Sequence, residues 1–134
     1  MAITNSAGIP FALCVTSAAP HEVNLVKKSL SSRFVKKLPK WLVGDRAYDS
    51  DALDRDLAKR NIVMIAPHKK NRLDETKTQD GRSLKRYQKR WVVERFFAWL
   101  QNYRRVVVRY EYYLENFIGF VQLAAAAILL KKYF

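Results

Sequence analysis

Two acidic residues stand where a carboxylate could meet a phosphate group. Asp45 follows the short apolar run Trp41 to Val43 in "WLVGDRAY", so a buried strand would deliver it just beyond the strand's carboxyl end, the usual place for a site in an open α/β sheet. Glu94 lies in "YQKRWVVERFFAWLQNYRRVVVRYE", a stretch rich in Arg, Lys and large apolar residues. Because hard cations such as Mg²⁺ prefer carboxylate oxygens, this pair in a basic surround predicts a divalent-metal site that faces phosphate.

Each carboxylate also has a simpler interpretation. Asp45 fits a turn or a helix cap, because Asp is favoured in turns. Glu94 fits a solvated ion pair with Arg90 or Arg95. The spacing of Tyr87, Arg90 and Glu94 places those three on one helical face, but it leaves both interpretations of Glu94 open.

Composition and charge narrow the class of protein. The chain has 134 residues, 49% of them hydrophobic, which is the size and composition of one globular domain spanning residues 1–134. Its 25 Lys and Arg outnumber 12 Asp and Glu, giving a net charge of +13. A chain this basic favours a polyanionic partner, with nucleic acid first and an anionic membrane surface second. A soluble domain that is merely basic is the remaining interpretation.

Further features predict a cytoplasmic protein. Cys14 is the single cysteine, so no disulfide can form within one chain, and this fits a reducing compartment. The first ten residues lack the basic and apolar segments of a secretory signal. The apolar run from Phe117 to Leu130 contains Gln122 and is shorter than the roughly 20 residues that span a bilayer. We therefore expect a buried core helix there and no membrane partner.

Hydrophobic periodicity predicts an α/β fold. Turn residues before a period-two run indicate a hairpin, and Trp41 to Ala66 reads as strand, helix and strand, a unit that normally forms parallel strands with a right-handed crossover. The expected elements are a strand over Phe11–Ala18, a helix over His21–Arg33, a strand over Trp41–Val43, a helix capped by Asp49 or Ser50 and stopped near Asn61, a strand over Ile62–Pro67, a loop over His68–Arg82, and helices over Leu84–Glu111 and Leu114–Tyr133.

The long helix should dock on the sheet through an apolar stripe, with Glu94 at its edge. That stripe comprises Val93, Phe96, Phe97, Leu100 and Tyr103. His21 and His68 have no partner at metal-ligand spacing, so we expect structural or exposed roles for both.

At these same residues the chain resembles a known family. "VGDRAYDS" and the stretch around Glu94 look like the second-aspartate and glutamate motifs of the DDE transposases of bacterial insertion sequences, nearest to the insertion sequence five group. The family pattern is Tyr, two residues, Arg, three residues, Glu, six residues, Lys or Arg. Tyr87, Arg90 and Glu94 match it, whereas Gln101 departs from it. "NSAGIPFALCVTSAAPHE" resembles the segment after the first catalytic aspartate, so the resemblance covers nearly the whole chain.

The resemblance implies a ribonuclease-H-like fold that is incomplete at its amino-terminal, central strand. In the family that strand carries the first aspartate, and no aspartate precedes Asp45 here. Residues 1–134 would then form a single partial catalytic domain, the carboxyl-terminal part of a transposase. Such a part could be a truncated remnant or the second reading frame of an element that makes its enzyme by frameshifting.

Roles for individual residues follow from the same resemblance. Asp45 and Glu94 would ligate Mg²⁺, or Mn²⁺ in its place, together with the absent aspartate. Tyr87 and Arg90 would hold DNA phosphate near the cut. Four further arginines are candidates for a phosphate surface, because guanidinium matches phosphate oxygens. They are Arg95, Arg104, Arg105 and Arg109.

The implied activity is DNA cleavage and strand transfer, with DNA as the main partner and the chain itself or the upstream transposase segment as a second. The isolated chain is expected to be inactive, since one carboxylate is missing. The alternative is a catalytically inactive remnant that binds DNA or a transposase and modulates transposition. Trp91 and Trp99 could stack on an exposed base, although aromatic residues at helical spacing are also typical of a core.

Overall fold

A β-hairpin opens the chain, as the turn chemistry predicts. The computed structural model describes residues 1–17, 19–73 and 84–133. Strand β1 (Ala2–Thr4) pairs with β2 (Pro10–Leu13) in antiparallel register, with Ala2 opposite Leu13. The second strand is therefore shorter than the predicted run to Ala18, a residue that lies outside the described part of the chain.

The strand–helix–strand unit is confirmed. Helix α1 (Glu22–Ser31) leads to β3 (Trp41–Val43), helix α2 (Asp51–Ala58) and β4 (Val63–Ile65). The two strands are parallel, with Trp41 opposite Val63 and Val43 opposite Ile65.

Local capping explains the limits of α2. The Ser50 hydroxyl accepts a hydrogen bond from the Leu53 N–H at 3.4 Å, which satisfies one of the free donors in the first turn. After α2 the chain leaves the helix at Asn61, which takes a left-handed conformation with φ +56° that Asn tolerates. Ser50, one of the two predicted caps, is thus the true cap, and Asn61 ends the turn as predicted.

The second half of the chain is helical but more broken than predicted. A 3₁₀ helix, η3 (Lys85–Arg90), runs into α4 (Trp91–Leu100), and then come α5 (Arg104–Val107) and α6 (Leu114–Tyr133). The prediction of one helix from Leu84 to Glu111 is wrong beyond Leu100. Tyr103 adopts an extended backbone there (φ −100°, ψ 107°), and β-branched valines follow it. The helix at Leu114–Tyr133 is confirmed.

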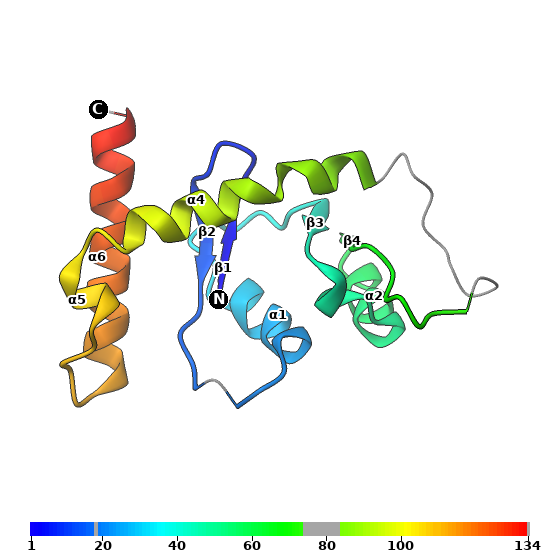
Figure 1. Cartoon of the computed structure of the whole chain (residues 1–134), viewed down its shortest axis with the longest axis horizontal. Coiled ribbons are helices and arrows are strands. Elements are labelled where there is room, and N and C mark those ends of the chain that lie inside the picture. Colours follow the sequence, from blue (N-terminus) through cyan, green and yellow to red (C-terminus); the bar gives the residue numbers. More distant parts are fainter. Residues whose placement is uncertain (18, 74–83, 134) are drawn as a thin grey trace.

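The buried face of α4 differs from the predicted stripe. Val92, Phe96 and Leu100 are buried, while Phe97 is exposed. This face packs on β1 and on α6, so the positions of those two elements select which residues turn inward. Figure 1 shows α4 crossing the molecule above the hairpin, with α6 standing crosswise at one end.

The hairpin separates two hydrophobic cores. The first core joins α1 and α2 to β3 and β4, and the second joins α4 and α6 to β2. Ile3 and Phe11 pack toward the first core, whereas Ala2 and Leu13 pack toward the second. The largest fully buried side chains are Phe96, Leu30, Leu57, Ile62, Ile65 and Val26.

The mixed helix and strand content agrees with an α/β fold. Within residues 1–17, 19–73 and 84–133 the strands form two separate two-stranded sheets, β1–β2 and β3–β4. The predicted buried strand Trp41–Val43 is buried only at Leu42, because Trp41 and Val43 point to the exposed face of the sheet. Val63 on β4 is also half exposed. A ribonuclease-H-like arrangement, with a central strand between the two sheets, stays a prediction. The predicted loop over 68–82 is described only as far as Leu73, where it is irregular, and its remainder lies outside the described residues.

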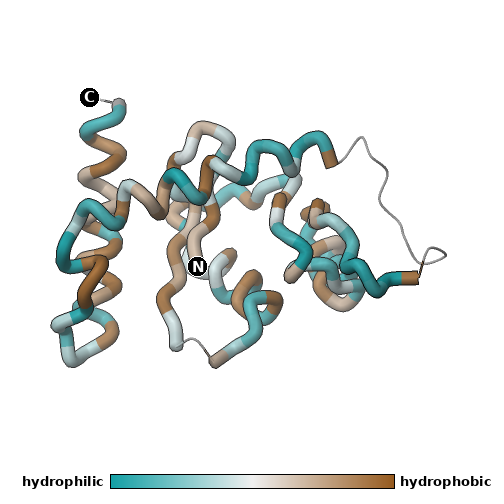
Figure 2. The backbone as a smooth tube through the Cα atoms, viewed as in Figure 1, coloured by the Kyte–Doolittle hydropathy of each residue, from teal (hydrophilic) through white to brown (hydrophobic). Residues whose placement is uncertain are grey.

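Helix α6 is buried on one face only, although apolar residues line most of its length. Val121, Ala124 and Ile128 are buried against the second core, while Leu123 and Leu130 face outward. Figure 2 shows hydrophobic residues recurring along α6. By length and composition alone its segment Leu114–Lys132, with a mean hydropathy of 1.5, could cross a membrane. The predicted buried core helix is therefore correct on one face only.

Candidate active site

Asp45 lies at the carboxyl end of β3, where it starts the short 3₁₀ helix η1 (Arg46–Tyr48). Its Oδ1 accepts a hydrogen bond from the Ala47 N–H at 2.9 Å, so the cap interpretation is confirmed. One carboxylate oxygen is used in this way. The other, Oδ2, faces the α4 side of the molecule, and the side chain is 40% exposed.

Close packing fixes the joint before Asp45. The Gly44 N–H donates to the Ile65 carbonyl oxygen at 3.0 Å, which carries the parallel ladder one residue past β3. A Cβ at Gly44 would stand 2.5 Å from the Met64 methyl carbon and 2.7 Å from a ring carbon of Tyr48. Burial, then the nearby Glu22 carboxylate, raises the pKa of that tyrosine, so its hydroxyl stays protonated.

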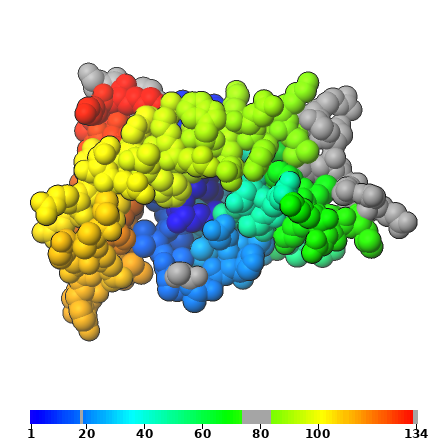
Figure 3. All heavy atoms as spheres, in the orientation of Figure 1, coloured from blue at the N-terminus to red at the C-terminus, as the bar shows by residue number. Residues whose placement is uncertain are grey.

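One guanidinium joins the two predicted site carboxylates. Arg90 Nη2 lies 2.8 Å from Glu94 Oε1, and Arg90 Nη1 lies 3.7 Å from Asp45 Oδ2. The Glu94 side chain is 58% exposed. The ion-pair interpretation of Glu94 is thus confirmed with Arg90 as partner, and the same arginine brings residues from β3 and α4 into one site. Figure 3 shows η3 and α4 running over the surface beside β3.

The Tyr87 ring packs against the Arg90 guanidinium. The Arg90 guanidinium carbon lies 5.5 Å from the centroid of the Tyr87 ring, a cation–π distance. The expected common face of Tyr87, Arg90 and Glu94 is therefore present, even though the first turn is 3₁₀ rather than α-helical. Arg86 covers the exposed face of Trp41 on β3 in the same way, at 4.6 Å.

The other predicted phosphate-binding arginines lie elsewhere. The guanidinium carbon of Arg95 packs over the rings of Trp91 and Trp99, at 4.5 and 5.0 Å, on a different side of α4 from Arg90. Arg104 is exposed at the start of α5.

The last two arginines stabilise the loop between α5 and α6. Arg105 pairs with Glu111 at 3.0 Å, and Arg109 donates to the main-chain carbonyls of Glu111 and Tyr112, each at 3.0 Å. Their guanidinium carbons also lie over rings of α6, Arg105 at 5.3 Å from Phe120 and Arg109 at 5.9 Å from Phe117, so both arginines tie the loop to that helix.

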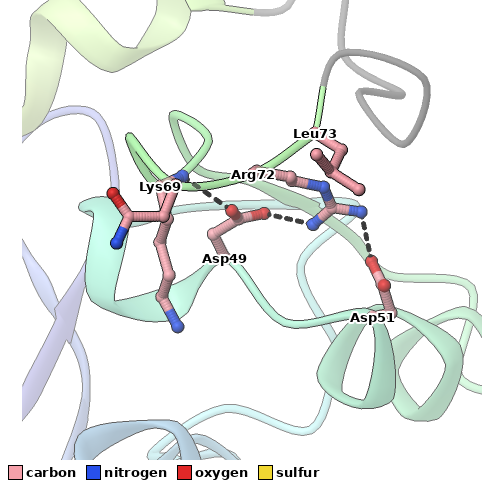
Figure 4. A pocket seen from close by; sticks show the side chains of 6 residues that line it. Asp49, Asp51, Lys69, Arg72 and Leu73 are labelled. Atoms are coloured by element: carbon pink, nitrogen blue, oxygen red, sulfur yellow. Dashed lines mark hydrogen bonds and ion pairs between the residues drawn. The ribbon is translucent and has the colours of Figure 1, made fainter.

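A second carboxylate cluster was missed by the sequence analysis. The Asp49 side chain is only 2% exposed and accepts hydrogen bonds from the Lys69 N–H at 2.8 Å and from Arg72 Nη1 at 2.8 Å (Figure 4). His68 Nδ1 lies 3.0 Å from Asp49 Oδ1. Arg72 also reaches Asp51 at 2.6 Å. His68 therefore has the structural role, one of the two expected for it, as a hydrogen-bond partner of Asp49.

These contacts set the charge state of the cluster. Burial by itself raises the pKa of Asp49, but the Lys69 N–H, His68 and the Arg72 guanidinium outweigh it and hold that pKa below its ordinary value. The sequence signal was the polar run "HKKNR" directly after a buried strand. Basic residues at that position can pair with an acidic residue between the two strands, as Arg72 does with Asp49.

The donor set at Asp45 and Glu94 is a carboxylate pair. In the part of the chain that the structure describes, no three His, Cys, Asp or Glu side chains gather as a metal cluster. Both carboxylates are partly exposed, and the Arg90 guanidinium is the cation that they face.

Comparison with known proteins decides the family. The profile of the transposase DDE domain matches residues 1–129, nearly the whole chain. The chain belongs to the DDE transposase family of insertion sequences. A protein of Burkholderia cepacia, named as a transposase for insertion sequence element IS402, is 28% identical over 134 residues, which cover 94% of this chain and 59% of that protein.

A second transposase relative comes from Brucella ovis. This protein, named for insertion sequence element IS6501, is 38% identical over 91 residues, which cover 67% of this chain and 67% of that protein. No solved structure matches the chain significantly. This chain thus spans about three fifths of the length of the IS402 relative. Membership of the insertion sequence five group stays a prediction.

Proposed function

We propose that this chain is the carboxyl-terminal part of a transposase catalytic domain, which binds DNA through the basic face around Arg90 and supplies two carboxylates for metal-dependent strand cleavage and transfer. The observation that carries the proposal is the single guanidinium between Asp45 and Glu94. Asp45 follows a strand end and Glu94 lies on a helix far along the chain, and Arg90 contacts both. Membership of the DDE transposase family supports DNA cleavage and strand transfer as the chemistry of these carboxylates.

The donor chemistry fits a divalent ion. Asp45 Oδ2 lies 3.7 Å from Arg90, beyond hydrogen-bond distance, so this oxygen keeps its lone pairs for another cation. Carboxylate oxygens are the ligands that Mg²⁺ and Mn²⁺ prefer. When bound, such an ion polarises phosphate oxygens and activates an attacking hydroxyl or water. Asp45 and Glu94 would hold it.

When a metal ion is bound, Arg90 would contact DNA phosphate instead of the carboxylates. A guanidinium between two carboxylates occupies the region where a positive charge is stabilised, and a divalent ion there would repel it. Arg90 would turn toward a DNA phosphate, with the Tyr87 ring limiting how far it can swing. In the absence of ion and DNA, Arg90 lowers the repulsion between the two carboxylates.

We also propose that a third carboxylate comes from a segment outside these 134 residues. The two separate sheets support this proposal, because a strand between β1 and β3 would join them into one and would place its own side chains beside Asp45. Unpaired strand edges expose free N–H and C=O groups that favour pairing with another strand. The preceding aspartate of the family pattern would enter on that strand.

A reconstitution experiment tests the whole proposal. The chain should be assayed for nicking of DNA that carries the ends of its element, in Mg²⁺ and in Mn²⁺, alone and fused to the upstream coding segment. We expect cleavage only from the fusion, together with a more cooperative thermal unfolding. DNA binding of the chain alone should weaken steeply with salt, since each phosphate contact contributes about −0.9 to the slope of log K against log salt.

The controls are Asp45→Asn and Glu94→Gln in the fusion, which should abolish nicking while leaving DNA bound. Cleavage by the 134-residue chain alone would refute the need for a third carboxylate. DNA binding by the chain without cleavage in any fusion would instead favour the catalytically inactive, DNA-binding alternative.

A further inference from the structure

A hollow of about 340 Å³ lies where the last turn of α6 meets the far side of α4, away from the Arg90 face. Its volume is at the lower end of the range of about 300–1,000 Å³ for ligand pockets. The residues that line it are Arg95, Trp99, Asn102, Tyr103, Ile128, Lys131 and Lys132. Neither Asp45 nor Glu94 lines it, so the hollow is separate from the carboxylate pair.

The walls are built from cations held against an indole ring. The Arg95 guanidinium carbon lies 5.0 Å from the centroid of Trp99, and Lys132 Nζ lies 5.0 Å from the same ring. Lys132 Nζ also donates to the Ala7 carbonyl oxygen at 2.6 Å, which ties α6 to the turn of the hairpin. These contacts fix the positions of two charges from two helices at one rim.

The charge of the lining is of one sign. Arg95, Lys131 and Lys132 bring three cations, and no carboxylate lines the hollow among the described residues. The carboxyl end of α6 carries a partial negative charge of roughly half a unit, which three full positive charges outweigh. An anion is therefore the ligand that this lining favours.

One polar atom in the wall lacks a protein partner. Arg95 Nε is buried and makes no hydrogen bond within the part of the chain that the structure describes. A buried donor without a partner is costly, and a ligand acceptor would satisfy it. The Asn102 amide and the Tyr103 hydroxyl can add neutral donors, while Ile128 and the Trp99 edge offer apolar contact.

We propose that this hollow is a second phosphodiester-binding site, which holds a backbone phosphate of DNA and its sugar at a distance from the reacting phosphate. Phosphate matches the three cations and the guanidinium fork, and the apolar wall fits the carbons of a deoxyribose. The cations already cover the Trp99 ring, so the site reads the backbone rather than a stacked base. This assignment rests on the proposed function, in which the chain binds DNA.

The consequence is a divided contact with DNA. Arg90 meets the strand that is cut, whereas the hollow on the other side of α4 would grip DNA away from the cut. Contacts at Arg90 and at the hollow, on different sides of α4, would fix the direction in which DNA leaves the site. The chain would therefore orient its DNA as well as bind it.

Fluorescence anisotropy with a labelled duplex tests this site. Lys131→Gln should weaken duplex binding about three- to tenfold and reduce the salt slope by about 0.9, the value for one lost phosphate contact. Lys28→Gln is the matched control, because Lys28 is an exposed lysine on α1 that lines neither site and loses the same charge. It should change affinity less than twofold and leave the slope intact.

A second measurement follows the indole N–H signals of the three tryptophans by NMR, with Trp99 assigned by Trp99→Phe. Inorganic phosphate, thymidine monophosphate and a duplex should each shift the Trp99 signal in the wild-type chain, and thymidine without phosphate should not. Lys131→Gln should weaken the shifts at unchanged spectral dispersion, which shows that the fold is kept.

The outcomes separate the two proposals. Equal losses for Lys131→Gln and Lys28→Gln, in a chain that binds DNA with a steep salt dependence, would overturn the second site and leave the proposed function standing. A response to free phosphate alone, with duplex affinity unaffected by Lys131→Gln, would overturn the DNA assignment. A wild-type chain that binds no DNA would overturn the proposed function itself.

Discussion

Asp49 and the Asp45–Glu94 pair show two ways in which this chain holds a carboxylate. Asp49 is 2% exposed and is contacted by Lys69, His68 and Arg72. Asp45 and Glu94 are 40% and 58% exposed and face a single guanidinium. The first carboxylate is fully satisfied by the protein, and the other two are not.

This difference separates structural from ligand-binding acids. A buried carboxylate is tolerated only when its lone pairs accept hydrogen bonds, so Asp49 must contribute to the stability of the β3–β4 unit. An exposed carboxylate with oxygens left over costs the fold little and can take a cation. The number of hydrogen-bond donors around each carboxylate therefore distinguishes a structural acid from a ligand-binding one. The position of the acid in the sequence does not make that distinction.

The largest effect is expected at Asp49. Asp49→Asn should lower the free energy of unfolding by about 3 kcal/mol, because it leaves the Arg72 charge without its buried partner. Asp51→Asn is the control, since Asp51 binds the same arginine at 2.6 Å from an exposed position and should cost less than about 1 kcal/mol. Urea unfolding of the two variants measures both values. Equal losses would mean that burial does not distinguish the two acids.

A smaller effect should follow pH. The pKa of Asp49 is held below its ordinary value in the folded chain, so the folded state favours the ionised form. Its stabilising contribution is complete above the unfolded pKa of about 3.9 and is lost as pH falls through the folded pKa. Urea unfolding from pH 6 to pH 3 should show the wild type losing its advantage over Asp49→Asn at the acid end. A constant difference across that range would contradict the assignment.

The smallest effect on stability should come from Glu94. Its ion pair with Arg90 is an exposed helical pair, worth at most about 0.5 kcal/mol, so Glu94→Gln should leave the fold almost unchanged. Metal binding should respond instead. Paramagnetic broadening of the Ala47 amide signal by Mn²⁺ should need several times more metal in Glu94→Gln than in the wild type.

Glu115→Gln is the control for that change, because it removes another exposed glutamate, at the start of α6. It should leave the broadening as it is. If Glu94→Gln unfolds the chain and does not alter the response to Mn²⁺, then Glu94 belongs with Asp49 as a structural acid.

The parts of the fold that sequence predicted well are those that depend on local signals. The apolar run at Trp41–Val43, the cap at Ser50 and the turn at Asn61 are each decided within a few residues, and all three are found in the structure. The break after Leu100 and the rotation of the buried face of α4 depend on how α6 and the hairpin pack. Helical periodicity does not contain that information.

The same reasoning applies to the site. Motif spacing brought Tyr87, Arg90 and Glu94 together because they lie within a few turns of one another. The Asp49 cluster was missed because its partners come from a loop after β4, and polar residues in a loop carry no periodic signal. Ion pairs between residues so far apart in sequence can be predicted only once the arrangement of β3, α2 and β4 is known.

Gly44 has a consequence for which variants of this chain can exist. A side chain there would meet the Tyr48 ring at 2.7 Å, and a ring atom so near the backbone cannot move aside as the Met64 methyl group can. Any replacement must therefore displace η1, and with it the carboxylate of Asp45. In a library of randomised codons, we therefore expect glycine alone to be selected at this position. Gly44 is thus the residue of the motif that tolerates the fewest substitutions.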